Sequence, residues 1–86
     1  MDYYVYVLKS ELDGRLYEGH TSRLEERIKE HNSGKTSSTK GYRPWKLVHQ
    51  EIFETEKEAI ERERFLKSGT GREFLKEIIR PRGATE

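Results

Sequence analysis

The 86-residue chain contains no cysteine, one methionine and two prolines, and it has no long apolar run. The absence of cysteine excludes a disulfide framework and cysteine-ligated zinc, so packing and hydrogen bonds must stabilise the fold. A transmembrane helix needs about 20 apolar residues, and a secretory leader needs an apolar stretch before a small-residue cleavage site. Neither pattern is present, and we expect a soluble cytoplasmic protein.

Apolar residues are also scarce, at 31% of the chain, whereas charged residues make up 38%. An average domain has about 25% charged residues. This composition would permit disorder, but the net charge is only +1 and the strand and helix periodicities are clear. We expect one small domain over residues 1–80 with a thin core, followed by a disordered tail over residues 81–86.

Charge is unevenly distributed along the chain. Residues 21–49 contain seven basic and three acidic residues, a local charge of +4, whereas residues 50–68 contain four basic and six acidic residues. A local basic patch favours a polyanionic partner such as nucleic acid. A pI near 8.0 predicts only weak nonspecific affinity for it.

Three segments show the pattern of strands. Residues 3–9 carry apolar side chains on both alternating faces, which is typical of a central strand, and residues 45–53 also alternate. Asp13-Gly14 predicts a hairpin turn that leads to a strand over residues 15–20. A hairpin loop with an even number of residues places Tyr17 and Gly19 on the same face as Tyr6.

Three helices are expected, each begun by a capping box. The boxes pair Ser22 with Glu25, Thr55 with Glu58, and Thr70 with Glu73. Gly34 would end the first helix, Lys67 the second and Pro81 the third, whose buried stripe would be Phe74, Leu75, Ile78 and Ile79. The fold class is therefore α/β, a three-stranded antiparallel sheet flanked by three helices in the order β-β-α-β-α-α.

The segment between the first helix and the third strand has no apolar periodicity. It ends at Pro44 and carries Lys35, Lys40 and Arg43, which predicts a mobile loop. These cations could bind nucleic acid, or they could belong to a solvated loop.

Ionisable residues occupy positions where helices normally carry apolar ones. At 100° per residue from Leu24, His31 falls inside the apolar stripe at about 340° and Arg27 borders it at about 300°. Glu63 falls in the middle of the second helix's stripe. The conservative interpretations are a hydrogen-bonded core histidine and an ion pair between Glu63 and Arg27 or another base. Tyr6 and Tyr17 could likewise be ordinary strand tyrosines.

Together these residues suit phosphodiester hydrolysis. A carboxylate can hold Mg²⁺, which keeps most of its waters and can accept a substrate phosphate. An arginine can stabilise charge on the phosphate oxygens. A tyrosine could be the general base only if nearby positive charge lowered its pKa.

The sequence resembles the GIY-YIG nuclease superfamily over residues 3 to about 78. Tyr4-Val5-Tyr6 matches its first motif, with tyrosine in the glycine position, and Tyr17-Glu18-Gly19 matches its second. Arg27 and Glu63 match the helix arginine and the metal-binding glutamate. The pattern K-x-x-S-T-K-x-x-R-P over residues 35–44 and L-K-S-G-x-G-R-E-F over residues 66–74 are similar to the small stand-alone members, which are largely uncharacterised.

The resemblance implies a metal-dependent endonuclease that cuts DNA with Mg²⁺ or Mn²⁺. The resemblance implies that Tyr17 is the general base and that Tyr6 supports it by hydrogen bonding. Arg27 would bind the scissile phosphate, Glu63 would hold the metal, and His31 would assist in proton relay or phosphate contact. The larger family nucleases carry separate DNA-binding domains, so in this chain substrate choice would depend on the basic helix and loop, on nucleic-acid shape or on a protein partner. The alternatives are a noncatalytic nucleic-acid-binding module and a protein-interaction domain without salt-dependent binding.

Three positions depart from the family pattern. Glu18 replaces an aliphatic residue, and it would either pair with Lys9 across the hairpin or loosen the strand. His20 occupies a variable position, to which we attach no role. The asparagine that follows the metal glutamate in larger members has no clear counterpart.

Overall fold

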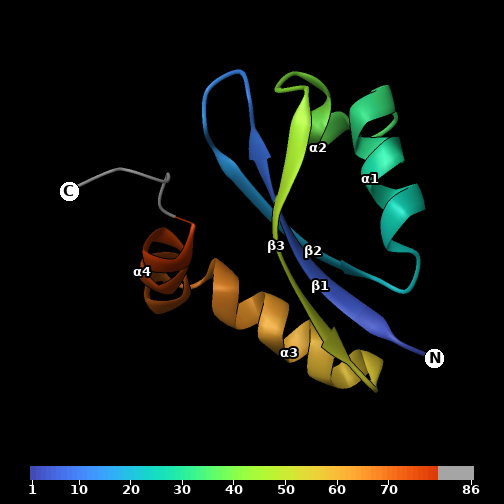
Figure 1. The fold of residues 1–86 in the computed structure, drawn as a ribbon, viewed down its shortest axis with the longest axis vertical. Coiled ribbons are helices and arrows are strands. Elements are labelled where there is room, and N and C mark those ends of the chain that lie inside the picture. The colour runs from blue at the N-terminus through green and yellow to red at the C-terminus, as the bar shows by residue number, and fades with distance from the viewer. Residues whose placement is uncertain (80–86) are drawn as a thin grey trace.

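A three-stranded antiparallel sheet in the order β2-β1-β3 forms the centre of the molecule (Figure 1). The computed structural model describes residues 1–79. Its elements in chain order are β1 (Tyr3–Ser10), β2 (Leu16–Thr21), α1 (Leu24–Ser33), α2 (Ser37–Lys40), β3 (Trp45–Phe53), α3 (Glu56–Lys67) and α4 (Gly69–Ile78). The predicted α/β class and the central first strand are confirmed. The short helix α2 was not predicted.

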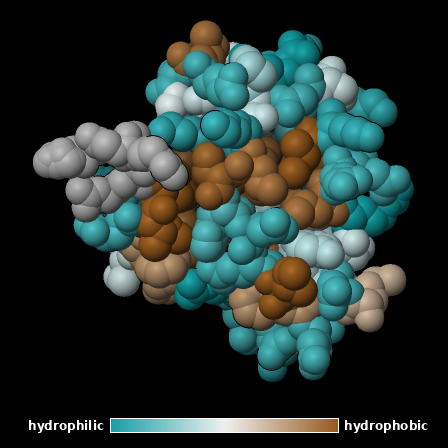
Figure 2. All heavy atoms as spheres, viewed as in Figure 1, coloured by the Kyte–Doolittle hydropathy of each residue, from teal (hydrophilic) through white to brown (hydrophobic). Residues whose placement is uncertain are grey.

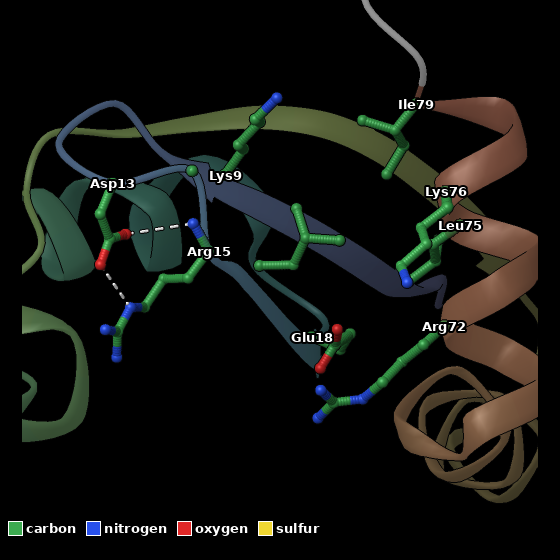
Figure 3. Close-up of a pocket in the computed structure, with 10 residues that line it drawn as sticks. Lys9, Asp13, Arg15, Glu18, Arg72, Leu75, Lys76 and Ile79 are labelled. Atoms are coloured by element: carbon green, nitrogen blue, oxygen red, sulfur yellow. Dashed lines mark hydrogen bonds and ion pairs between the residues drawn. The ribbon is translucent and has the colours of Figure 1, made fainter.

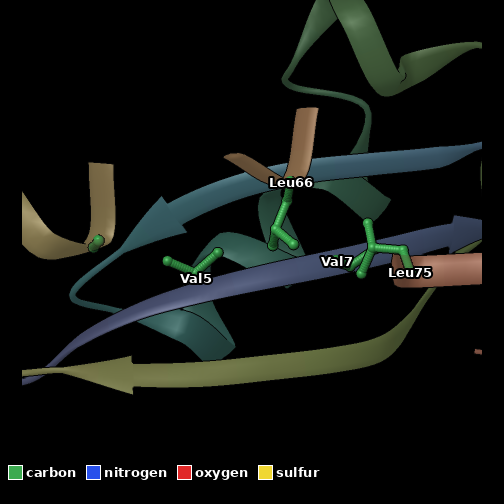
Figure 4. Close-up of a cluster of buried hydrophobic side chains, with 5 residues drawn as sticks. Val5, Val7, Leu66 and Leu75 are labelled. Carbon is green, nitrogen blue, oxygen red and sulfur yellow. The ribbon is translucent and has the colours of Figure 1, made fainter. Parts of the chain in front are cut away.

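Each face of the sheet has its own core, because β1 is buried on both sides. Val5 and Val7 pack with α3 and α4 through Ala59, Leu66 and Leu75 (Figure 4). Tyr6 and Leu8 pack on the other face with Trp45, and α1 covers this face through Leu24 and Ile28. The cores are small, and hydrophobic surface reaches the exterior in a band from α4 toward the strands (Figure 2).

The hairpin register places the motif residues as expected. Tyr6 lies opposite Gly19, and Leu8 lies opposite Tyr17, so the two tyrosines share one face of the sheet. Leu16, Glu18 and His20 alternate with these residues and lie on the face covered by α3 and α4. Glu18 lies opposite Val7 on that apolar face.

Helix ends follow the capping rules at some positions and depart from them at others. The Thr55–Glu58 capping box is present, and Gly34 ends α1 with a left-handed φ of 89°. The predicted Ser22–Glu25 box is wrong: Arg23 is the N-cap residue and has no side-chain capping bond. The backbone N–H of Arg23 instead donates to Thr21, and this local turn delays the first helical residue to Leu24.

The start of α4 also differs from the expectation. Ser68, rather than Thr70, is the N-cap residue, and its hydroxyl accepts the N–H of Gly71. A β-carbon at Gly71 would lie 1.9 Å from the carbonyl oxygen of Phe65, so only glycine permits this close approach of α4 to α3. The buried stripe is shifted accordingly, and Ile78, which was predicted to be buried, is 46% exposed.

The predicted mobile loop is the largest correction. Residues 37–40 form α2, and its Thr39 is fully buried. The indole of Trp45 donates to the carbonyl of Thr39 at 2.8 Å, which anchors the segment to β3. The predicted disordered tail, residues 81–86, lies outside the described residues. Within residues 1–79, no helix is long and apolar enough to cross a membrane.

Candidate active site

A buried chain of hydrogen bonds connects β1, α1 and α2. The Tyr6 hydroxyl lies 3.0 Å from His31 Nε2, and His31 Nδ1 lies 2.9 Å from the Thr39 hydroxyl. Thr39 donates its proton to the carbonyl of Thr36, so it accepts from Nδ1 of His31. His31 Nε2 is then an acceptor, and Tyr6 donates to it. The chain fixes both the ring orientation and the tautomer of His31.

The pKa shifts agree with these roles. Burial raises the pKa of Tyr6 to about 12, Tyr17 and Glu63 add to the rise, and Arg27 opposes it. Burial lowers the pKa of His31, and the positive charge of Arg27 lowers it further. A neutral phenol therefore donates to a neutral imidazole at physiological pH. Tyr6 is poorly suited to act as a base.

Tyr17 lies beside this pair but is only partly buried. Its ring centroid is 4.8 Å from that of His31 and 6.3 Å from that of Tyr6. Trp45 contacts it edge-on at 6.3 Å. Aromatic packing thus holds the Tyr17 ring, while its partial exposure leaves it accessible to water.

Arg27 lies on α1, one helical turn before His31. Its Nη1 donates to Glu30 at 2.7 Å, which restrains the side chain. Hydrogen bonding to Glu30 raises the pKa of Arg27, and Tyr6 and Tyr17 contribute to the rise. The guanidinium is therefore held close to both phenols.

Glu63 approaches from α3, on the other side of the sheet from α1. Its Oε1 accepts from His20 Nδ1 at 2.5 Å, and its Oε2 accepts from Lys67 at 2.8 Å. Burial alone would raise the pKa of Glu63, but the hydrogen bonds from Lys67 and His20 bring it below its usual value. The predicted ion pair is present with another base, and Arg27 is not its partner.

Electrostatic effects link Glu63 to the two phenols. Glu63 contributes to the raised pKa of Tyr6. Hydrogen bonding to Glu63 raises the pKa of Lys67 against the effect of burial, and Tyr17 adds to the rise. β2, which carries Tyr17, is an edge strand of the sheet, and Lys67 interacts electrostatically with Tyr17 from α3. The structure places Tyr6, Tyr17 and His31 in direct contact, and Glu63 joins them only through longer-range interactions.

The cations of the 35–44 segment form no contact of their own with the rings of this cluster among the described residues. Lys35 and Lys40 are exposed. Arg43 donates from Nε to the carbonyl of Lys40 at 2.8 Å, and its guanidinium lies against Gly34. Arg43 is therefore the best ordered of the three, and all three lie at the end of α1 that carries His31.

Two site residues were missed by the sequence reasoning. Thr39 gives no periodic signal because it is one buried residue in a polar segment. His20 does carry a signal: strand alternation places it on the same face as Glu18, toward α3. Its partner Glu63 is 43 residues away, and nothing in the local sequence indicates that contact.

The sequence was compared with models of known protein families. The model of the GIY-YIG catalytic domain matches residues 2–76. The chain therefore belongs to the GIY-YIG family, as the resemblance of its motifs indicated.

Within the family, the chain is similar to small proteins named UPF0213. It is 42% identical over 77 residues to the UPF0213 protein of Staphylococcus saprophyticus, covering 88% of this chain and 93% of that protein. It is 46% identical over 76 residues to the UPF0213 protein of Clostridium perfringens, covering 87% of this chain and 81% of that protein. The solution NMR structure of UPF0213 protein BH0048 from Bacillus halodurans matches with a TM-score of 0.54 and 38% identity, covering 87% of this chain and 82% of that chain.

Proposed function

We propose that this protein is a divalent-metal-dependent endonuclease that hydrolyses phosphodiester bonds of DNA. The observation that carries the proposal is the cluster of Tyr17, Tyr6 and His31, whose rings lie within 6.3 Å of one another beside the Arg27 guanidinium. Membership of the GIY-YIG family supports a nuclease-type site.

The roles of the two tyrosines follow from their surroundings. Tyr6 is buried, has a pKa of about 12 and donates to His31, so it is a positioning residue. Tyr17 is more exposed and lies near the positive charges of Arg27 and Lys67. The Tyr17 hydroxyl can therefore reach an attacking water, and these cations can hold a phosphate beside it. We assign the general base to Tyr17.

Arg27 is the phosphate-binding residue in this proposal. A guanidinium can donate two parallel hydrogen bonds to a phosphate and stabilise the charge that develops on it during hydrolysis. The bond to Glu30 holds the side chain in place before substrate arrives. This pre-ordering reduces the entropy that must be lost on binding.

Glu63 is the residue that would hold the metal ion. The described residues contain no group of three or more acidic, histidine or cysteine side chains suited to a metal. One carboxylate still fits Mg²⁺, which commonly binds through one or two carboxylates and keeps its waters. When bound, such an ion would supply Lewis-acid stabilisation of the phosphate. Lys67 is 48% exposed and can move away from Glu63 to admit it.

A noncatalytic phosphate-binding module is the second candidate. It is favoured by the fact that both carboxylate oxygens of Glu63 already have cationic or N–H partners. In that case Arg27 and Lys67 would bind phosphate without hydrolysis, and nucleic-acid binding would depend on salt.

Nicking of supercoiled plasmid, and cleavage of branched and single-stranded DNA, with Mg²⁺ or Mn²⁺ tests the proposal. Glu63→Ala and Tyr17→Phe should abolish cleavage. Glu61→Ala on the exposed side of α3 and Tyr3→Phe on the other face of the sheet are matched controls that should retain it. Cleavage that persists in both site variants contradicts the nuclease assignment, and salt-dependent binding without cleavage supports the phosphate-binding module.

A further inference from the structure

A pocket lies on the opposite face of the sheet from the tyrosine cluster. It has a volume of about 770 Å³ and opens between the β1–β2 hairpin and α4 (Figure 3). This volume is within the range of about 300–1,000 Å³ that is typical of small-molecule sites. The pocket lies outside the proposed nuclease site.

The buried carboxylate of Glu18 is the unusual feature of this pocket. Glu18 is only 5% exposed and lies opposite Val7, on the face where β1 contributes valines to the core. Burial raises the pKa of Glu18, and the cations Arg72 and Lys67 counter only part of this effect. Among the described residues, its carboxylate is in no ion pair. The expected pair with Lys9 does not form, because Lys9 lies opposite Leu16.

A charged side chain at a position this buried is costly, and such a position would normally carry valine or isoleucine. The carboxylate faces the pocket and is available to a ligand with N–H donors. The guanidinium of Arg72 extends toward it from α4 (Figure 3). Nε of Arg72 donates to the carbonyl of Lys67, and within residues 1–79 its terminal nitrogens form no hydrogen bond, so they can donate to an acceptor on the same ligand.

The rest of the pocket is apolar in the middle and charged at the rim, where Asp13 is paired with Arg15 and two lysines add positive charge. Leu75 and Ile79 of the α4 segment form the apolar wall. Lys9 lies at the far end from Glu18 (Figure 3), and among the described residues it is in no ion pair. Lys76 also lines the rim and is paired only loosely, at 3.5 Å, with Glu73. The ligand is therefore expected to have a planar or apolar body and an anionic group.

Guanine is the nucleobase whose edge fits Glu18 and Arg72 together. Its N1–H and N2–H donors are adjacent and can bind one carboxylate, while its O6 acceptor can bind an arginine. Adenine and cytosine place a ring nitrogen acceptor beside the amino group, and this acceptor would face the carboxylate lone pairs. We propose that this pocket binds a guanine nucleotide, with the base edge at Glu18 and Arg72 and the phosphate at the Lys9 end.

A titration with guanosine 5′-monophosphate, followed by amide chemical shifts in ¹H–¹⁵N NMR spectra of the full chain, tests this site. The amides of Glu18, Arg72 and Ile79 should shift, and those of Tyr17 and His31 should not. The wild-type protein should bind adenosine and cytidine monophosphates at least about tenfold more weakly than guanosine monophosphate. The Glu18→Gln variant should bind guanosine monophosphate more weakly than the wild type by a similar factor. Glu11→Gln, an exposed acid near the end of β1, is the matched control.

Two further measurements separate the parts of the site. Lys9→Met should weaken the binding of guanosine monophosphate more than the binding of guanosine. Lys46→Met should change neither affinity. Glu18→Ile should raise the urea midpoint of the free protein, because it removes a buried charge, and should abolish binding. A lower midpoint would show that the carboxylate is structural and would overturn the proposal. Equal affinity for inorganic phosphate, equal affinity for adenosine monophosphate, or shifts confined to the tyrosine face would also overturn it.

This inference is independent of the nuclease proposal. Tyr17→Phe and Glu63→Ala should bind guanosine monophosphate as the wild type does, whatever their effect on DNA cleavage. The failure of one proposal is thus distinguishable from the failure of the other.

Discussion

Gly19 lies directly against the phenol of Tyr6, and a β-carbon at position 19 would be 2.6 Å from the Tyr6 hydroxyl oxygen. Tyr6 cannot move aside easily because it is 1% exposed and its hydroxyl is bound to His31. The glycine of the second motif is therefore explained by packing: the two residues face each other across the β1–β2 ladder.

Gly19→Ala should displace Tyr6 and destabilise the protein by about 1–3 kcal/mol, as expected for overpacking in a core. Gly41→Ala is the control, because nothing lies within 4 Å of a β-carbon there. Urea unfolding gives the free energies. A Gly19→Ala variant as stable as Gly41→Ala would show that the Tyr6 ring is free to shift.

Thr39→Val should lower stability by about 1–3 kcal/mol, because His31 Nδ1 loses its buried partner. It should also shift the tautomer equilibrium of His31, which ¹⁵N NMR of the imidazole reports directly. Ser38→Ala, on the exposed side of α2, should leave both quantities unchanged. Retention of the wild-type tautomer in Thr39→Val would mean that Tyr6 alone fixes the ring.

The pKa of His31 predicts a pH dependence of stability. Burial lowers this pKa below its usual value of 6.5, so the unfolded chain binds a proton between these two pKa values while the folded chain does not. The free energy of unfolding should be largest above pH 6.5 and fall as the pH decreases toward the folded pKa of His31. Urea unfolding between about pH 7.5 and about pH 5 measures the slope. His31→Gln should lose this contribution and His49→Gln should keep it, and an unchanged slope in His31→Gln would assign the effect elsewhere.

Tyr6→Phe and Tyr17→Phe should differ in how much they reduce the rate of plasmid nicking and in how that rate depends on pH. Loss of a general base costs about 10²–10⁴ in rate, which we expect for Tyr17→Phe. Tyr6→Phe should cost about tenfold, in line with the loss of one hydrogen bond. If Tyr6 were the base, its variant would show the larger loss and the rate would rise only near pH 12. Rates of plasmid nicking as a function of pH distinguish the two.

Arg27→Ala should reduce nicking by about 10²–10³, the usual cost of removing a positioned donor to a developing negative charge. Lys40→Ala, at the exposed end of α2, should reduce it only a few-fold through weaker DNA binding. Lys29→Ala is the control on α1, because it removes the same charge from an exposed position on the same helix. Similar losses in all three variants would indicate that only the overall positive charge of this region matters.

The strands and their register were predictable because the signals are local. Alternation over residues 3–9 and the Asp13-Gly14 turn fix the hairpin, and parity alone places Tyr17 on the Tyr6 face. Thr55 caps α3 as expected because its capping box has no competitor nearby. At α4, both Ser68 and Thr70 could cap, and the close contact of Gly71 with α3 selects Ser68.

The rest of the site depends on contacts between distant residues. The stripe of α1 identified His31 as an inward polar residue, but its partner Thr39 lies in a segment without periodicity. The stripe of α3 identified Glu63, and its partner Lys67 lies one turn further along the same helix, but its partner His20 depends on how α3 crosses the edge of β2. Sequence patterns give the direction in which a side chain points. They do not give the neighbour it meets when that neighbour belongs to another layer.

Successive residues of β1 point into different cores, with Val5 toward α3 and α4 and Tyr6 toward α1. The strand thus partitions the molecule into two compartments that share a backbone but few side chains. Substitutions that reshape the α4 compartment can accumulate while the tyrosines opposite keep their geometry. Relatives of this chain could therefore diverge in what they bind on one face and retain a common chemistry on the other.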